Sequence, residues 1–132
     1  MLKITRKVEY ALIALRHLQQ MERGQLSSAK SMALEYGIPQ ELLAKILQKL
    51  SRQKIISSVK GPTGGYKICK DPSTVNMTKF FEILEGPVGI MDCYFDSNCE
   101  QLNGCNIREP INRINDNIRT MFNKMTLADI TY

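Results

Sequence analysis

The chain has 132 residues, 43% of them hydrophobic, which allows one domain with a core of its own, or a small domain plus an accessory helix. No run of about eighteen apolar residues occurs, which argues against a membrane-spanning helix. The first residues also lack the apolar stretch of a secretory signal, so we expect a cytoplasmic protein with reduced thiols. The net charge of +5 is unevenly divided, because residues 1–70 carry +9 and residues 71–132 carry −4. Basic residues can serve solubility alone, but this division also suits a front half that faces a polyanion.

The front half begins with two stretches of helical pattern. Apolar residues recur at helical spacing over residues 5–20, and Thr5 is suited to be the N-cap. Ser27 or Ser28 then caps a second, short helix, which ends before Gly37, a residue able to adopt the left-handed conformation of a helix end.

A third helix begins around Pro39, which we place in the first turn because its missing N–H costs nothing there. Two short helices separated by a tight glycine turn, the second amphipathic, predict a helix-turn-helix. The apolar face of this third helix comprises Leu42, Leu43, Ile46, Leu47 and Leu50.

Residues 55–60 and 65–69 have the composition of two strands, joined by the turn sequence Gly61-Pro-Thr-Gly-Gly65. A plain hairpin that closes the core would have the same pattern. Directly after a helix-turn-helix, however, a β-hairpin predicts a winged helix. We therefore expect a mainly α fold with a small β-hairpin, in which residues 1–75 form a winged helix-turn-helix DNA-binding domain.

The expected DNA contacts follow from this geometry. Polar residues near the start of the third helix would reach base edges in the major groove. A helix N-terminus can bind a phosphate through its N–H groups, and a slender wing tip beside a cation suits the minor groove. The predicted DNA-binding residues are Ser28, Gln40, Glu41, Lys45, Gln48, Lys60, Gly61 and Thr63.

The rear half, residues 76–132, combines a short helix over residues 77–84 with a longer one that starts near residues 107–109, with Pro110 in its first turn. Apolar residues of the longer helix repeat at steps of four and three, the pattern of a coiled-coil seam. The helix could also pack this stripe on its own core. We prefer a dimerisation helix, because a homodimer would set two recognition helices one DNA turn apart on a near-palindromic site. The seam comprises Ile107, Ile111, Ile114, Ile118, Met121 and Met125.

Between these helices, Cys93, Cys99 and Cys105 lie six residues apart in a polar segment. Only a folded-back loop brings three thiols at this spacing together. Structural zinc sites use cysteines two to four residues apart, whereas an iron–sulfur cluster accepts longer spacings, and simple burial suits a polar segment poorly. We expect an iron–sulfur cluster, with 2Fe–2S preferred and 4Fe–4S possible. A site with three cysteines leaves one position for another ligand, which suits a sensor.

Several motifs together resemble the Rrf2 family of dimeric bacterial winged-helix regulators, especially its iron–sulfur members. They cover essentially the whole chain. The resemblance implies a cluster held by the three cysteines and a homodimer whose affinity for a near-palindromic operator changes with the cluster state. Iron supply, oxygen, superoxide or nitric oxide would be the signal. The motifs are Leu2-Lys-Ile-Thr5, Glu9-Tyr-Ala-Leu12, Gly37-Ile-Pro39, Val59-Lys-Gly-Pro-Thr-Gly-Gly-Tyr66, the cysteine spacing and Met125-Thr-Leu-Ala-Asp-Ile130.

The resemblance also bears on the fourth ligand. Members like IscR place a histidine three residues after the last cysteine, where this chain has Arg108, a permanent cation that cannot ligate iron. Members like NsrR use a carboxylate from the first helix of the other subunit, and that position matches Glu9. We therefore expect Glu9 to complete the site across the dimer. The predicted function is a DNA-binding repressor without enzymatic activity. The alternatives are a clusterless regulator that uses a thiol switch or a partner protein, and a small redox protein unrelated to DNA.

Overall fold

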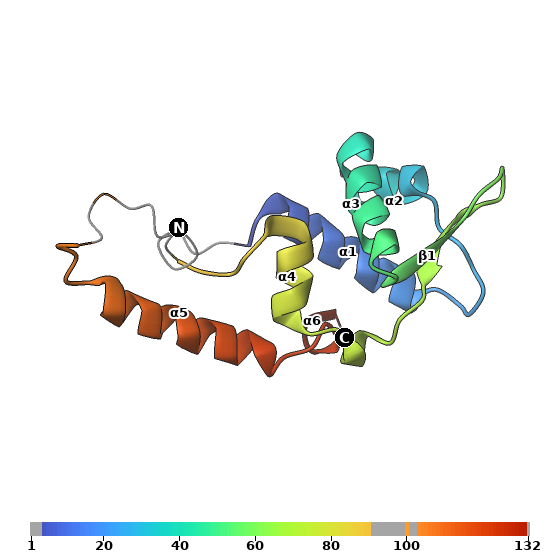
Figure 1. Ribbon diagram of the computed structural model, residues 1–132. Coiled ribbons are helices and arrows are strands. Elements are labelled where there is room, and N and C mark those ends of the chain that lie inside the picture. The colour runs from blue at the N-terminus through green and yellow to red at the C-terminus, as the bar shows by residue number, and fades with distance from the viewer. Residues whose placement is uncertain (1–3, 91–99, 101–102, 132) are drawn as a thin grey trace.

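The computed structural model describes residues 4–90, 100 and 103–131 of the chain. The described part is mainly helical with one antiparallel two-stranded sheet, as the sequence predicts (Figure 1). None of its helices is long and apolar enough to cross a membrane. In chain order the elements are α1 (Arg6–Gln20), α2 (Ala29–Tyr36), α3 (Gln40–Arg52), β1 (Ile56–Val59), β2 (Gly65–Ile68), the 3₁₀ turn η1 (Pro72–Thr74), α4 (Met77–Glu85), α5 (Arg108–Asn123) and α6 (Ala128–Thr131).

Local chemistry sets the ends of the first three helices. The Thr5 side chain accepts a hydrogen bond from the N–H of Val8 and begins α1, and Ser28 rather than Ser27 caps α2. Gly37 ends α2 with φ at 66°, which confirms the expected left-handed residue. The prediction for Pro39 was wrong by one position: it is the N-cap, and α3 begins at Gln40.

The wing is the hairpin of β1 and β2, which are slightly shorter than expected. Ile56 pairs with Ile68, and Val59 pairs with Gly65. The turn between the strands needs glycine, because Gly61 has φ at +114° and a Cβ on Gly64 would lie 2.0 Å from the Val59 carbonyl oxygen. The wing is therefore closed by a turn of little bulk.

A single hydrophobic core joins the front and rear halves of the chain. Leu15 of α1 and Leu47 of α3 are fully buried, and so are Phe80 of α4 and Leu127 just before α6. Elements on both sides of residue 75, the boundary proposed between the two parts of the chain, therefore share one core.

Backbone hydrogen bonds return the C-terminal segment to this core. The N–H of Leu127 donates to the carbonyl of Val75 at 2.8 Å, and the N–H of Met77 donates to the carbonyl of Met125 at 3.1 Å. Between these points the chain leaves the core after α4 and returns to it along α5, whose first residues lie far from the winged helix (Figure 1). Arg108 is the first residue of α5, so Pro110 lies in the first turn as predicted.

Candidate functional site

Helix α3 separates a buried apolar face from an exposed polar face. Leu43, Ile46, Leu47 and Leu50 are buried against the core. On the opposite side the four residues predicted to reach base edges are all exposed: Gln40, Glu41, Lys45 and Gln48. Pro39 offers no side-chain hydrogen bond to the first turn, so that turn carries N–H groups without a side-chain acceptor. The start of α3 thus presents polar side chains and backbone donors together.

The other predicted DNA contacts lie on the wing and at the start of α2. Lys60, Gly61 and Thr63 are exposed in the wing turn, as is Lys67 on β2. Ser28 is half-buried, and its side chain accepts a hydrogen bond from the N–H of Ser31 at 3.0 Å. Its hydroxyl therefore serves as a helix cap, and a phosphate at this position would be bound by backbone N–H groups.

His17, which the sequence left without a role, joins α1 to α2 and to the segment before α2. Its Nδ1 lies 2.7 Å from the Tyr36 hydroxyl, and its Nε2 lies 3.2 Å from the Ser27 hydroxyl. Partial burial raises the pKa of Tyr36 above its ordinary value of 10.0, and the neighbouring Glu35 carboxylate raises it further. These contacts tie α1 to both ends of α2, and nothing in the local sequence around His17 signals them.

Only part of the predicted metal site lies in the described residues. Cys93 and Cys99 lie outside them, whereas Cys105 carries a free, half-buried thiol shortly before α5. The described residues contain no group of three His, Cys, Asp or Glu side chains that could hold a metal. Glu9 projects from the first turn of α1, where its carboxylate lies 3.2 Å from Arg6 and is 46% exposed. Its carboxylate is therefore open to solvent on one side.

Cys69 and Arg108 are two further residues that bear on the predicted metal site. Cys69, the last residue of the second predicted strand, lies just after β2 instead, and its thiol is exposed. Arg108 is half-buried, and its Nε is shielded from solvent without a hydrogen-bond partner in the described part of the chain. A guanidinium in this position supplies a cation beside the cysteine segment and no iron ligand.

The predicted seam of α5 divides into two sets. Ile107, Ile114 and Met121 are seven residues apart, and each leaves about half of its surface exposed, between 46% and 51%. The other three seam residues, Ile111, Ile118 and Met125, are half-buried. Packing on the chain's own core therefore accounts for only one side of the stripe.

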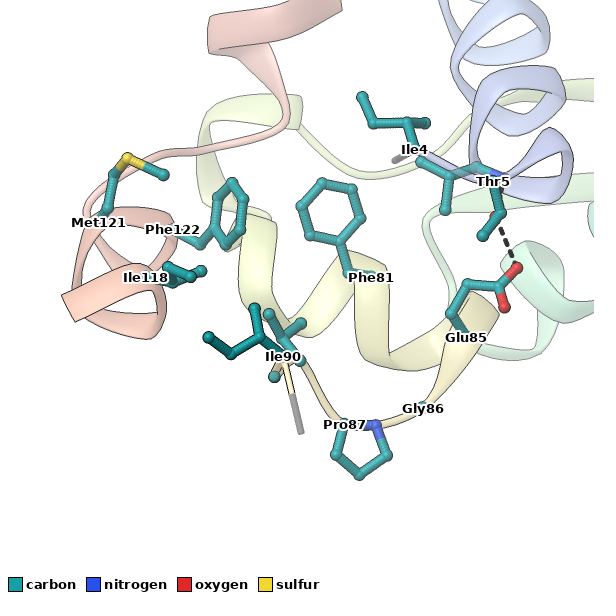
Figure 2. Close-up of a pocket in the computed structure, with 13 residues that line it drawn as sticks. Ile4, Thr5, Phe81, Glu85, Gly86, Pro87, Ile90, Ile118, Met121 and Phe122 are labelled. Carbon is teal, nitrogen blue, oxygen red and sulfur yellow. Dashed lines mark hydrogen bonds between the residues drawn. The ribbon is translucent and has the colours of Figure 1, made fainter. Parts of the chain in front are cut away.

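An apolar cavity of about 390 Å³ lies beside this seam, between the start of α1, the end of α4 and the second half of α5 (Figure 2). The Thr5 hydroxyl donates a hydrogen bond to the Glu85 carboxylate at its rim at 2.7 Å. Phe81 and Phe122 lie in edge-to-face contact, with ring centroids 5.0 Å apart. The cavity thus adjoins the half of α5 that lies closest to α4.

One polar residue breaks the expected division of α5. Asn115 lies between the positions of the predicted seam, yet it is the buried residue of the helix, with 0% of its surface exposed. Its Oδ1 accepts a hydrogen bond from the N–H of Ile90 at 2.7 Å, and Arg119 donates to the carbonyl of Val88 at 3.0 Å. These two side chains hold the segment that leads into the cysteines.

The model of the Rrf2 family, described as "Iron-dependent Transcriptional regulator", matches residues 4–132. The chain belongs to the Rrf2 family. It is 29% identical over 126 residues to a putative HTH-type transcriptional regulator of Aquifex aeolicus, with 93% of this chain and 87% of that one covered. It is 27% identical over 136 residues to a putative rrf2-like regulator of Rhodobacter capsulatus, with coverage of 96% and 91%. The protein is accordingly a transcriptional regulator and no enzyme.

Solved structures of Rrf2 regulators have the same fold. CymR of B. subtilis, named as its global cysteine regulator, aligns with a TM-score of 0.74 and 25% identity over 99% of this chain and 97% of that one. T. potens IscR aligns with a TM-score of 0.69 and 23% identity over 97% and 85%. The winged-helix prediction is therefore confirmed.

Proposed function

We propose that this Rrf2 regulator is a repressor whose affinity for DNA is controlled by an iron–sulfur cluster bound to Cys93, Cys99 and Cys105. The observation that carries the DNA-binding part is the exposed polar face of α3 beside an exposed, slender wing. The cluster part rests on the spacing of the three thiols in the sequence and on the free, half-buried thiol of Cys105. A bound cluster would supply chemistry that responds to iron supply, redox state or nitric oxide.

The proposed working form is a homodimer in the cytoplasm on a near-palindromic operator. The half-exposed Ile107, Ile114 and Met121 support a seam between two copies, because three apolar residues at heptad spacing otherwise face water. Across such a dimer Glu9 of the partner subunit would complete the ligand set. Its solvent-facing carboxylate on α1 supports this role, since it is held only by the exposed Arg6 in the described chain.

The alternative is a clusterless regulator of the same family that acts through a thiol switch or a partner protein. The similarity to CymR, a protein named as a cysteine regulator, favours it. The exposed thiol of Cys69 also gives a thiol switch a possible reactive group.

Anaerobic purification followed by DNA binding separates the two. Our proposal expects brown protein with visible charge-transfer absorption, and an operator affinity that changes when the cluster is removed. A Cys99→Ser variant should lose the colour, whereas Cys69→Ser, the matched control, should keep it. Colourless protein that still binds promoter DNA with a steep salt dependence would support the alternative instead.

The fourth ligand has a separate test. Glu9→Ala should shift the visible absorption of the cluster and its reactivity with nitric oxide, while Glu22→Ala, an exposed carboxylate beyond the end of α1, should change neither. An unchanged spectrum and unchanged reactivity in Glu9→Ala would remove Glu9 from the ligand set without touching the role of the cysteines.

A further inference from the structure

The backbone of residues 88–90, the segment that leads into the cysteines, is hydrogen-bonded to side chains of α5. The N–H of Ile90 donates to Asn115 Oδ1 at 2.7 Å, and the carbonyl of Val88 accepts from Arg119 Nη1 at 3.0 Å. Asn115 and Arg119 are four residues apart and therefore lie on the same face of α5. Both side chains can then contact the same short backbone segment.

The same arginine continues to α4. Arg119 Nη2 lies 3.2 Å from Glu82 Oε1, with 25% and 38% of the two side chains exposed. Helix α4 in turn packs against α1, α3 and α5. A continuous set of contacts thus joins Val88 and Ile90 to the helix that supports the recognition helix.

The burial of Asn115 indicates a specific role. It is fully buried, and its Nδ2 has no hydrogen-bond partner in the described residues. Burying an amide in this way is unfavourable compared with an apolar residue of the same size. A polar residue at such a position fixes one arrangement of the chain rather than adding stability. Here the arrangement is the path of the backbone that precedes Cys93.

The position of α5 in the sequence supports the same role for Asn115. Val88 and Ile90 precede the first cysteine by a few residues, and α5 begins three residues after Cys105. The described residues on either side of the cysteine segment therefore contact the same helix or lead directly into it. Tying both ends of a segment shortens the free loop and reduces the ordering cost when its side chains converge on one ligand.

We propose that Asn115 and Arg119 are positioning residues that fasten the segment before the cysteines to α5 and, through Glu82, make DNA affinity depend on the state of that segment. This inference rests on the proposed function. In this proposal the contacts of Asn115, Arg119 and Glu82 couple the cysteine segment to the recognition helix, α3.

The first test needs no cluster. In cluster-free protein, Asn115→Ala should speed amide hydrogen exchange at Ile90 by roughly tenfold or more, because the N–H loses its buried acceptor. Asn117→Ala, a matched change on the exposed side of α5, should leave exchange at Ile90 as in the wild type. Equal exchange in Asn115→Ala and the wild type would overturn the fastening role.

The second test measures coupling as the ratio of operator affinities with and without the cluster. Arg119→Met and Glu82→Gln should each reduce this ratio several-fold while cluster-free affinity stays the same. Arg119→Lys, which keeps a donor, should restore part of it. Arg113→Met is the matched control, because within the described residues Arg113 pairs only with the exposed Glu109, at 3.6 Å. A ratio unchanged in both Arg119→Met and Glu82→Gln would refute the coupling role.

The Glu82→Gln variant also distinguishes a loss of coupling from a loss of folding. Its side chain is at the surface end of the contacts, so it should reduce coupling while Ile90 stays protected from exchange. If the wild type itself shows no cluster-dependent affinity, the proposed function fails. The exchange test would then still decide whether Asn115 holds the segment.

Discussion

Ser27 and Tyr66 exchange two backbone hydrogen bonds. The N–H of Ser27 donates to the carbonyl of Tyr66 at 3.0 Å, and the N–H of Tyr66 donates to the carbonyl of Ser27 at 2.8 Å. This bridge ties the residue before the N-cap of α2 to the second strand of the wing. The wing and the helix-turn-helix are therefore held in a fixed relation, as a DNA-binding surface built from both requires.

The close approach of these two segments makes Gly65 sensitive to substitution. A Cβ at this position would lie 2.8 Å from the backbone carbonyl carbon and oxygen of Ser27, neither of which can move alone. Gly65→Ala should lower the free energy of unfolding by about 1–3 kcal/mol, measured by urea denaturation. In Gly104→Ala the new Cβ meets no atom of the described residues within 4 Å, and a loss as large as in Gly65→Ala would contradict this explanation.

The C-terminal segment should contribute to the stability of the winged helix. Leu127 is completely buried in the common core, so Leu127→Ala should cost about 2–5 kcal/mol in unfolding free energy. Leu34→Ala should cost little, because that side chain is 76% exposed. Thermal and urea unfolding monitored by circular dichroism would test this. A mild effect of Leu127→Ala would mean that the front half is stable without the C-terminal residues.

The recognition surface predicts a sequence-specific effect for Gln48. Gln48 is exposed on α3, so Gln48→Ala should leave stability unchanged and weaken binding to the operator by about 1–3 kcal/mol. Binding to unrelated DNA should stay the same. Gln53→Ala, at the exposed C-terminal end of α3, serves as the control in titrations at fixed salt. An equal loss on operator and unrelated DNA would place Gln48 on the phosphates instead.

A single charge placed in the seam of α5 should dissociate the proposed dimer. Ile114 is 46% exposed in the single chain, so Ile114→Glu should leave its fold intact but place two like charges in a seam between copies. Analytical ultracentrifugation should show a monomer with weakened operator binding. Asn117→Glu adds the same charge outside the seam and should remain dimeric. A dimeric Ile114→Glu would move the interface elsewhere.

Asp71 predicts a change of stability in acid. Hydrogen bonds from Ser73, from the backbone N–H first and then from the side chain, lower the pKa of Asp71 below its ordinary 3.8. Because the pKa of Asp71 is lower in the folded state, its hydrogen bonds stabilise the fold at pH values above its unfolded pKa. This stabilisation is lost as the pH falls through the folded pKa. Thermal unfolding should therefore show wild type and Asp71→Asn converging below pH 3.8. A constant difference down to the lowest pH at which the protein folds would argue against this contribution.

Local patterns allowed most of the front half to be predicted. Thr5, Ser28 and Gly37 signal helix ends through their own backbone and side-chain chemistry, which does not depend on distant residues. The exposed face of α3 followed from the spacing of its apolar residues for the same reason. Pro39 was misplaced by one residue because a proline is compatible with both the N-cap and the first turn.

The rear half could be predicted less completely, because its contacts join distant parts of the chain. Asn115 is a polar residue of a type that usually lies at the surface, and its burial goes with a hydrogen bond to Ile90, 25 residues away in the chain. Leu127 similarly looks like part of a terminal turn until its pairing with Val75 is seen. The three cysteines remain a prediction from spacing, with Cys105 the member that the structure describes.

The pairing of Val75 and Met77 with Leu127 and Met125 brings together the two points where the chain departs from and rejoins the core. The stretch between the end of α4 and Met125 is in effect an insertion between two anchored stems. Because the two stems are hydrogen-bonded directly to each other, their pairing does not depend on the length of the stretch between them. A shortened or replaced stretch would therefore still be anchored at both ends to the same core.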